Sequence, residues 1–187
     1  LRPGGGRARF RVDAPLDSIE GVSRGLSGAL SFDEERWAGG TGRIGIDLKG
    51  FTTGLSLRDE DLRDQFFQAD AFPEAVLTVR ALERPTQGVL VPGRDGEADA
   101  VGTLLLHGKE RPVRVPVVVR LMDVADGRDV TVSGAFDVPF GDWGIPRPVR
   151  LFLKLGPVAH VRFEATFHAA GPARPAVALA APSPEPA

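Results

Sequence analysis

The chain has 187 residues, of which 42% are hydrophobic and 26% charged, a composition expected of one soluble domain with a tail. Its net charge is −2, so it lacks the basic excess that neutralises phosphates, and we expect no nucleic-acid partner. The absence of cysteine excludes thiol catalysis, disulfide bonds and cysteine-ligated metal. No apolar run has the roughly 20 residues of a membrane span, so the protein is not expected to cross a membrane.

The two ends of the chain are poor in residues that build a core. Residues 1–7 include three consecutive glycines and are expected to form a flexible leader. Residues 171–187 are mostly Ala and Pro, and such a segment cannot bury enough surface to offset the entropy of ordering. We therefore predict one folded domain over residues 8–170, followed by a disordered tail over 171–187.

The first predicted strands lie at Leu26–Phe32 and Ile44–Leu48, where apolar and other residues alternate with the period of a half-buried strand. Gly40 to Gly45 match the glycine pattern of dinucleotide-binding loops. That motif works only when a helix follows it, whereas a strand pattern follows here. We interpret these glycines as a turn entering a strand.

The next segment, Ser56–Phe67, is predicted to form the single short helix of the domain. Ser56 and Asp59 have the spacing of a capping box, and Leu62 and Phe66 share a helical face. The acidic residues at its start complement the helix dipole, and we interpret them as a solvated cluster.

Strand patterns then continue to the end of the domain, separated by turns that contain Gly or Pro. The predicted runs are Ala75–Val79, Val113–Leu121, Val130–Val138, Val149–Leu155 and Val161–Phe167. About eight sequential antiparallel strands and one helix predict an all-β fold. Closure into a barrel would remove the exposed strand edges that invite aggregation.

The sequence contains no recognisable catalytic or metal-binding constellation. His160 and His168 lie on one strand face but eight residues apart, roughly 26 Å at ~3.3 Å per residue, so they cannot share an ion. His107 precedes a glycine in a predicted turn. We therefore predict no catalytic residue, no metal and no cofactor. An enzyme would need a buried carboxylate with a raised pKa, for which Asp61 is the candidate.

The interior of such a barrel is either filled by its own side chains or roomy enough for one small ligand. Many residues predicted to face inward are small, which leaves room for a ligand. They are Gly28, Ala75, Ala100, Gly102, Gly134 and Ala165. The residue pattern alone leaves both interpretations open.

Three motifs in this order resemble the YceI-like family of bacterial polyisoprenoid-binding proteins. The first is Arg58-Asp59-Glu60-Asp61-Leu62-Arg63-Asp64-Gln65-Phe66-Phe67, followed by Phe72-Pro73. The second is Gly102–Val113, similar to the family's G-x-L-x-x-x-G-x-T-x-P-V hairpin, and the third is Phe140–Ile145. The family's helix His is Asp61 here, and its frequent hairpin Thr is Glu110. The resemblance covers nearly all of residues 8–170.

This resemblance implies a lipocalin-like antiparallel β-barrel whose apolar pore takes up an isoprenoid tail, without catalysis. The expected function is binding, sequestration or transport of a polyisoprenoid or another long-chain lipid. The alternative is a structural or protein-interaction module with a self-filled core. The compartment is left open between bacterial cytoplasm and periplasm, and a homodimer is compatible with the sequence.

The ligand-binding candidates are the apolar residues predicted to face inward, together with three residues of the helix. They are Leu30, Phe32, Ile44, Ile46, Leu62, Phe66, Phe67, Leu77, Val79, Leu104, Val115, Val117, Phe136, Leu153, Phe163 and Phe167. Arg58 and Arg63 are the candidates for contacts with an anionic head group, and a salt bridge within the helix explains them equally well.

Overall fold

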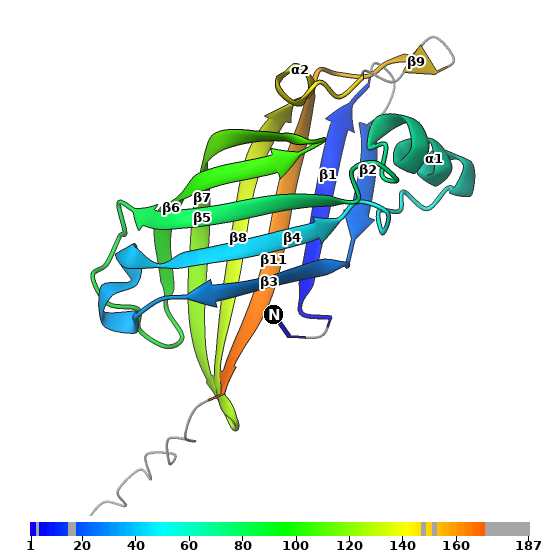
Figure 1. Ribbon diagram of the computed structural model, residues 1–187. Coiled ribbons are helices and arrows are strands. Elements are labelled where there is room, and N and C mark those ends of the chain that lie inside the picture. Colours follow the sequence, from blue (N-terminus) through cyan, green and yellow to red (C-terminus); the bar gives the residue numbers. More distant parts are fainter. Residues whose placement is uncertain (3, 15–17, 147–148, 151–152, 171–187) are drawn as a thin grey trace, which may run out of the picture.

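A computed structural model describes residues 1–2, 4–14, 18–146, 149–150 and 153–170, with the backbone alone for 149–150, 153–154 and 170. Its main feature is a nine-stranded antiparallel sheet with the order β2-β1-β11-β8-β7-β6-β5-β4-β3 (Figure 1). The strands are β1 (Gly6–Asp13), β2 (Ser18–Ser23), β3 (Leu26–Ser31), β4 (Thr41–Asp47), β5 (Glu74–Glu83), β6 (Asp95–Leu106), β7 (Lys109–Val124), β8 (Gly127–Pro139) and β11 (Val158–Ala170).

The sheet curls until its two halves face each other, so that β3, β4 and β5 cross in front of β1, β11 and β8 (Figure 1). Its edge strands, β2 and β3, are consecutive in the chain and joined by Arg24 and Gly25. The side chain of Leu26 in β3 packs directly on Gly6 of β1, which has no side chain to hold it away. The predicted all-β, barrel-like fold class is thereby confirmed.

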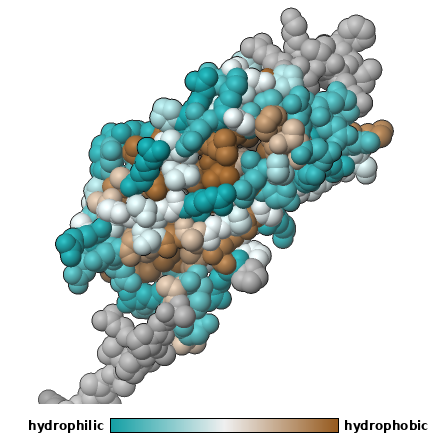
Figure 2. Space-filling view, viewed as in Figure 1, coloured by the Kyte–Doolittle hydropathy of each residue, from teal (hydrophilic) through white to brown (hydrophobic). Residues whose placement is uncertain are grey.

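The seam where β3 meets β1 is formed by packing. Within the described residues, the hydrogen-bonded strand ladders do not pair β3 with β1 or β2. Figure 2 shows apolar side chains at the surface in the middle of this face, around β3, between hydrophilic surroundings. The barrel therefore closes along a line of side-chain contacts, together with one hydrogen bond of 3.1 Å from the Leu1 nitrogen to the Gly28 carbonyl of β3.

One end of the barrel is closed by the 3-10 segment η1 (Glu34–Gly39) and by the loop between β5 and β6. Trp37 of η1 is fully buried, and its Nε1 donates a hydrogen bond of 2.7 Å to the carbonyl oxygen of Gln87 in that loop. Leu90 of the same loop is also buried, and its backbone N–H donates to the carbonyl of Glu34 at 3.0 Å. The loop and η1 thus brace each other over the barrel mouth.

Helical segments lie at the other end. They are α1 (Ser56–Asp61), its continuation η2 (Leu62–Phe66), which is one turn of π-helix, and α2 (Phe140–Trp143). The predicted helix is therefore present, but η1 and α2 add two short elements that the sequence pattern did not reveal. Among the described residues, no helix combines the length and apolar character needed to cross a membrane.

The predicted capping box is wrong. The helix begins after Leu55, and no side chain caps it. Asp59 reaches back to the preceding loop instead, where it accepts hydrogen bonds from Thr52 and Thr53. Asp59 is also buried, so the expectation that the whole acidic cluster is solvated does not hold for this residue.

The single strand predicted at Val149–Leu155 is also different in the structure. Its described backbone forms two short strands, β9 (Val149–Arg150) and β10 (Leu153–Lys154), which pair antiparallel with each other.

At the start of the chain, β1 begins at Gly6, and the backbone N–H of Arg2 donates to the Thr166 carbonyl at 2.9 Å, so contacts begin within the predicted leader. The predicted tail, 171–187, lies outside the described residues.

Strands β5 and β6 approach each other closely beside an irregularity in their pairing. Their register shifts between Val79 and Ala81, which marks a bulge. Gly102 of β6 lies opposite Val79, and a Cβ placed on it would overlap the carbonyl oxygen of Thr78. Glycine is therefore required here because the two backbones are in contact.

Candidate ligand site in the barrel interior

The interior of the barrel is an apolar core that contains two small cavities. The first, of about 40 Å³, lies toward the η1 end, and the second, of about 60 Å³, lies toward the α1 end. Their walls are apolar, with Thr41 as the polar exception among the lining side chains. The site thus offers dispersion contacts and almost no hydrogen bonds.

Twelve of the sixteen residues predicted from the sequence to bind the ligand line these cavities. The first cavity is lined by Leu30, Phe32, Ile44, Leu77, Val79, Val117 and Phe163. The second is lined by Ile46, Phe66, Phe67, Leu104 and Phe136. Their contact with a ligand remains a prediction.

The remaining four residues do not line either cavity. Leu62, Val115 and Phe167 are buried in the surrounding core. The side chain of Leu153 lies outside the described residues. Val115 belongs to the same inward face of β7 as Val117, which lines the first cavity. Strand alternation therefore predicts whether a side chain points into the barrel, but not whether its position along the barrel axis places it at a cavity.

The two cavities lie end to end along the same strands. On β4, Ile44 lines the first cavity and Ile46 the second. On β11, Phe163 lines the first and Val161 the second. Residues two apart on a strand face the same side about 6.6 Å from each other, so only one layer of side chains separates the cavities.

Two phenylalanines contribute to that layer. Phe163 lines the first cavity and Phe136 the second, and their ring centroids are 6.5 Å apart at an interplanar angle of 68°. Phe136 is only half-buried, so its ring is less constrained by packing than a fully enclosed one.

A cluster of aromatic rings surrounds the α1 end of the second cavity. Phe67 packs against Phe10, Phe51 and Phe66 with centroid distances of 5.9, 5.4 and 5.2 Å. Phe66 also packs edge-on against Phe140 of α2 at 4.9 Å. Such tilted and T-shaped contacts are the favourable geometries for aromatic pairs. The helix α1–η2 is thereby anchored over this end of the barrel by its phenylalanines.

The sequence interpretation missed several residues that complete the site. Trp37 and Leu90 close the first cavity from η1 and the following loop. Phe10 and Phe51 complete the second. Phe10 had a usable signal, because Ala8, Phe10 and Val12 alternate with arginines along β1. Trp37, Leu90 and Phe51 lie outside strands and have no periodic signal that identifies them.

The two predicted head-group residues are occupied by contacts within the helix region. Arg58 donates from Nε to the Thr53 hydroxyl at 2.8 Å and from Nη2 to the Thr53 carbonyl at 3.1 Å. Arg63 is half-buried, and its positive charge acts on Asp59. Both arginines therefore support the loop before α1. A head-group role for them remains a prediction.

Asp59 is the one buried carboxylate among the described residues. Burial alone would raise its pKa, but hydrogen bonds from both threonine hydroxyls and from the Thr53 N–H, each 2.6 Å long, together with the charge of Arg63, lower the pKa below its usual value. A carboxyl group held ionised in this way cannot serve as the protonated acid of an acid–base pair. Asp61, the candidate named for an enzyme, is half-buried.

The histidines have polar or aromatic partners. His160 Nδ1 lies 2.7 Å from Asp137 Oδ1, and His168 Nδ1 lies 2.9 Å from Asp129 Oδ1. His107 packs on the ring of Phe72 with a centroid distance of 4.4 Å. In the part of the chain that the structure describes, no three His, Asp or Glu side chains are grouped closely enough to hold a metal ion.

Solved structures from three bacteria have the same fold. A protein described as a polyisoprenoid binding domain from Saccharophagus degradans, implicated in plant cell wall breakdown, is 19% identical, has a TM-score of 0.71 and covers 90% of this chain and 97% of its own. BcnA of Burkholderia cenocepacia is 16% identical, with a TM-score of 0.67 and coverage of 87% and 96%. The YceI protein of Campylobacter jejuni is 17% identical, with a TM-score of 0.66 and coverage of 83% and 87%.

Sequence comparison gives the assignment that these distant structural likenesses cannot give alone. A search of curated proteins finds no match. The chain does match the YceI-like domain over residues 1–167, which is most of its length. These residues include all of the described sheet except the last three residues of β11. The chain therefore belongs to the YceI-like family.

Proposed function

We propose that the barrel interior binds a long apolar ligand, a polyisoprenoid or a related lipid, without chemical conversion. The observation that carries this proposal is the end-to-end arrangement of two apolar cavities along the barrel axis. A thin, flexible hydrocarbon chain suits an apolar lumen of this shape, since each CH₂ removed from water contributes about 0.8 kcal/mol and polar contacts are not needed. The family membership and the Saccharophagus degradans protein described as a polyisoprenoid binding domain support the same ligand class.

The size of the cavities requires that the interior expand on binding. Ligand pockets usually enclose about 300–1,000 Å³, whereas these cavities enclose about 40 and 60 Å³. Interior side chains, Phe163 and Phe136 first among them, must therefore move when a chain enters. The bound state would replace the present packing by contacts with the ligand.

The same small volumes favour the alternative, a structural or protein-interaction module whose core is complete without a ligand. In that case the two cavities are ordinary packing defects, and the interior has no reason to open. The two functions differ in a measurable way, because only the first predicts that the protein carries or takes up a lipid.

The test is extraction and uptake. Purified protein is denatured in organic solvent and the extract is examined by mass spectrometry for long-chain lipids, and delipidated protein is then titrated with geranylgeraniol. We expect a bound lipid or stoichiometric uptake. Absence of both would contradict the lipid proposal and favour the self-filled module.

Filling each cavity locates the binding site. Ala100→Leu reduces the first cavity and Ala75→Leu the second, because both alanines are buried and line these spaces. We expect at least tenfold weaker uptake from each. Thr103→Leu, on the outer face of β6 between these positions, is the matched control and should bind as the wild type does. If Ala100→Leu fails to fold, Ala100→Val provides a smaller addition at the same site.

A further inference from the structure

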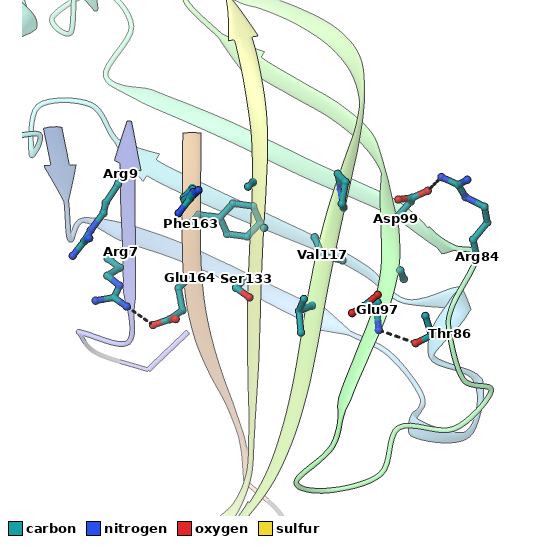
Figure 3. Close-up of a pocket in the computed structure, with 16 residues that line it drawn as sticks. Arg7, Arg9, Arg84, Thr86, Glu97, Asp99, Val117, Ser133, Phe163 and Glu164 are labelled. Atoms are coloured by element: carbon teal, nitrogen blue, oxygen red, sulfur yellow. Dashed lines mark hydrogen bonds and ion pairs between the residues drawn. The ribbon is translucent and has the colours of Figure 1, made fainter. Parts of the chain in front are cut away.

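A second concave surface lies on the outside of the barrel. A groove of about 740 Å³ extends over the outer face from β1 across β11, β8 and β7 to β6 (Figure 3). An adjoining groove of about 660 Å³ continues along β7, β8 and β11 toward α2. The two share Pro116, Ala135 and Arg162, so they form one continuous depression in which Arg162 is central.

The cationic wall of this groove contains two arginines that face each other. The register of β1 and β11 places Arg9 directly opposite Arg162. Like charges in this position destabilise a strand pair, because the Cβ atoms of opposed residues lie only about 5 Å apart. Among the described residues, neither arginine forms an ion pair or a side-chain hydrogen bond. The sheet therefore keeps an uncompensated pair of charges at the edge of a groove.

Two carboxylates lie diagonally across from the two arginines, Glu164 from Arg9 and Asp137 from Arg162. Each of these carboxylates has another partner. Glu164 pairs with Arg7 at 3.4 Å, its directly opposed neighbour. Asp137 is held by His160 at 2.7 Å. Asp99, on the far wall, is bound by Arg84 and by Arg114. Figure 3 shows Arg9 and the Arg7–Glu164 pair on one side of the groove, with Glu97 and Asp99 on the other. The three carboxylates are thus paired with other side chains, and Arg9 and Arg162 keep their charges unpaired on the β1 and β11 side.

An independent feature lies along the adjoining groove. Trp143 lines it, is 3% exposed, and its indole Nε1–H is buried without an acceptor among the described residues. An unsatisfied buried donor is costly, and a ligand that supplies an acceptor would remove that cost. The other tryptophan, Trp37, has its acceptor in Gln87. The grooves are therefore lined by two guanidinium groups without partners and by a tryptophan whose buried indole N–H lacks an acceptor among the described residues.

We propose that this outer groove is a second binding site, for a phosphate-bearing ligand held by Arg9 and Arg162. A guanidinium group can donate two parallel hydrogen bonds to two phosphate oxygens. A phosphate bound between Arg9 and Arg162 would therefore attract both arginines and offset the repulsion between them. The floor between the walls is uncharged and includes Pro116, Val118 and Ala135, which accommodate the body of an organic phosphate. The arginines of the site lie outside the lumen, since Arg162 faces outward, while Phe163 and Val117 line both the groove and the first cavity. It does not rest on the proposed lipid function.

The two tryptophans make the test specific. In a ¹⁵N-labelled sample each indole N–H gives one signal, and Trp37→Phe assigns the remaining one to Trp143. The probes are inorganic pyrophosphate, hexyl phosphate and hexanol. We expect the Trp143 signal to shift with a phosphate probe, while the Trp37 signal stays in place. Tighter binding of hexyl phosphate identifies an organic phosphate as the ligand class, and equal or tighter binding of pyrophosphate identifies the free anion.

Arginine variants decide whether the opposed pair is responsible. We expect Arg9→Gln and Arg162→Gln each to weaken phosphate binding at least tenfold and, without phosphate, to leave the melting temperature unchanged or raised. Arg80→Gln is the matched control, because Arg80 is an exposed arginine of β5 that does not line either groove. The proposal is overturned if neither phosphate probe binds, if hexanol shifts the Trp143 signal equally, or if Arg80→Gln loses as much affinity as the other two.

Discussion

At the scale of single residues, Asp59 combines two features that oppose each other. It is buried, which disfavours its charge, and it accepts three hydrogen bonds from Thr52 and Thr53, which favour it. The hydrogen bonds prevail, so the pKa of Asp59 is lowered. A group with a lower pKa in the folded state stabilises the fold above its unfolded pKa of about 4, and this contribution disappears as the pH falls through the folded pKa.

Asp59→Asn is therefore expected to destabilise the protein by about 1–3 kcal/mol at pH 7, because an amide cannot accept all three bonds as a carboxylate does. The difference from wild type should shrink as the pH falls below 4. Urea unfolding at pH 7 and at pH 3 measures both effects. Asp64→Asn, an exposed position on the same helix, serves as control. A difference that stays constant over this range would show that the charge of Asp59 is not involved.

Phe163 is the residue whose removal should change the lumen most. Phe163→Ala would join the two cavities and, as a large-to-small substitution in a core, cost about 3–5 kcal/mol of stability. We expect geranylgeraniol to bind more tightly to this variant than to wild type. The comparison is Phe167→Ala, which removes a buried ring from the same strand but from neither cavity. Equal affinities of the two variants would contradict a dividing role for Phe163.

At the scale of elements, β5 and β6 approach so closely at Gly102 that their backbones are in contact. Gly102→Ala is expected to destabilise the protein by more than about 2 kcal/mol, because the added methyl group overlaps the Thr78 carbonyl and the bulge must move. Gly88→Ala, where a Cβ meets no atom within 4 Å, should change stability by less than about 0.5 kcal/mol. Thermal unfolding of both variants is the measurement, and similar melting temperatures would refute the close-contact argument.

The strands were predictable where the alternation of apolar and polar residues was long and regular, as in Val113–Leu121 of β7 and Val161–Phe167 of β11. The pairing of β9 with β10 was not, since Val149–Leu155 contains no turn residue and alternates like one strand. The site was predictable to the same degree. The side of the sheet that a strand residue faces follows from local alternation. Trp37 and Leu90, in contrast, reach the lumen through contacts between η1 and a distant loop, which no local sequence pattern predicts.

At the scale of the whole molecule, ligand binding and folding are linked. A ligand that binds only the folded barrel stabilises it by about 2.7 kcal/mol when present at 100 times its Kd. We expect geranylgeraniol to raise the melting temperature in a concentration-dependent way. The Ala100→Leu variant should lose this increase, while Thr103→Leu keeps it. An unchanged melting temperature at saturating ligand would contradict binding to the native barrel.

The seam between β3 and β1 has a mechanical consequence. A barrel closed on all sides by strand ladders can widen only by breaking backbone hydrogen bonds, each of which contributes about 1 kcal/mol. Here Leu26 rests on Gly6 across a line that the described ladders do not bridge, so the wall can part there and close again with its strand pairing intact. Dilation of the lumen would thus separate β3 from β1 before it breaks the hydrogen bonds of any strand ladder.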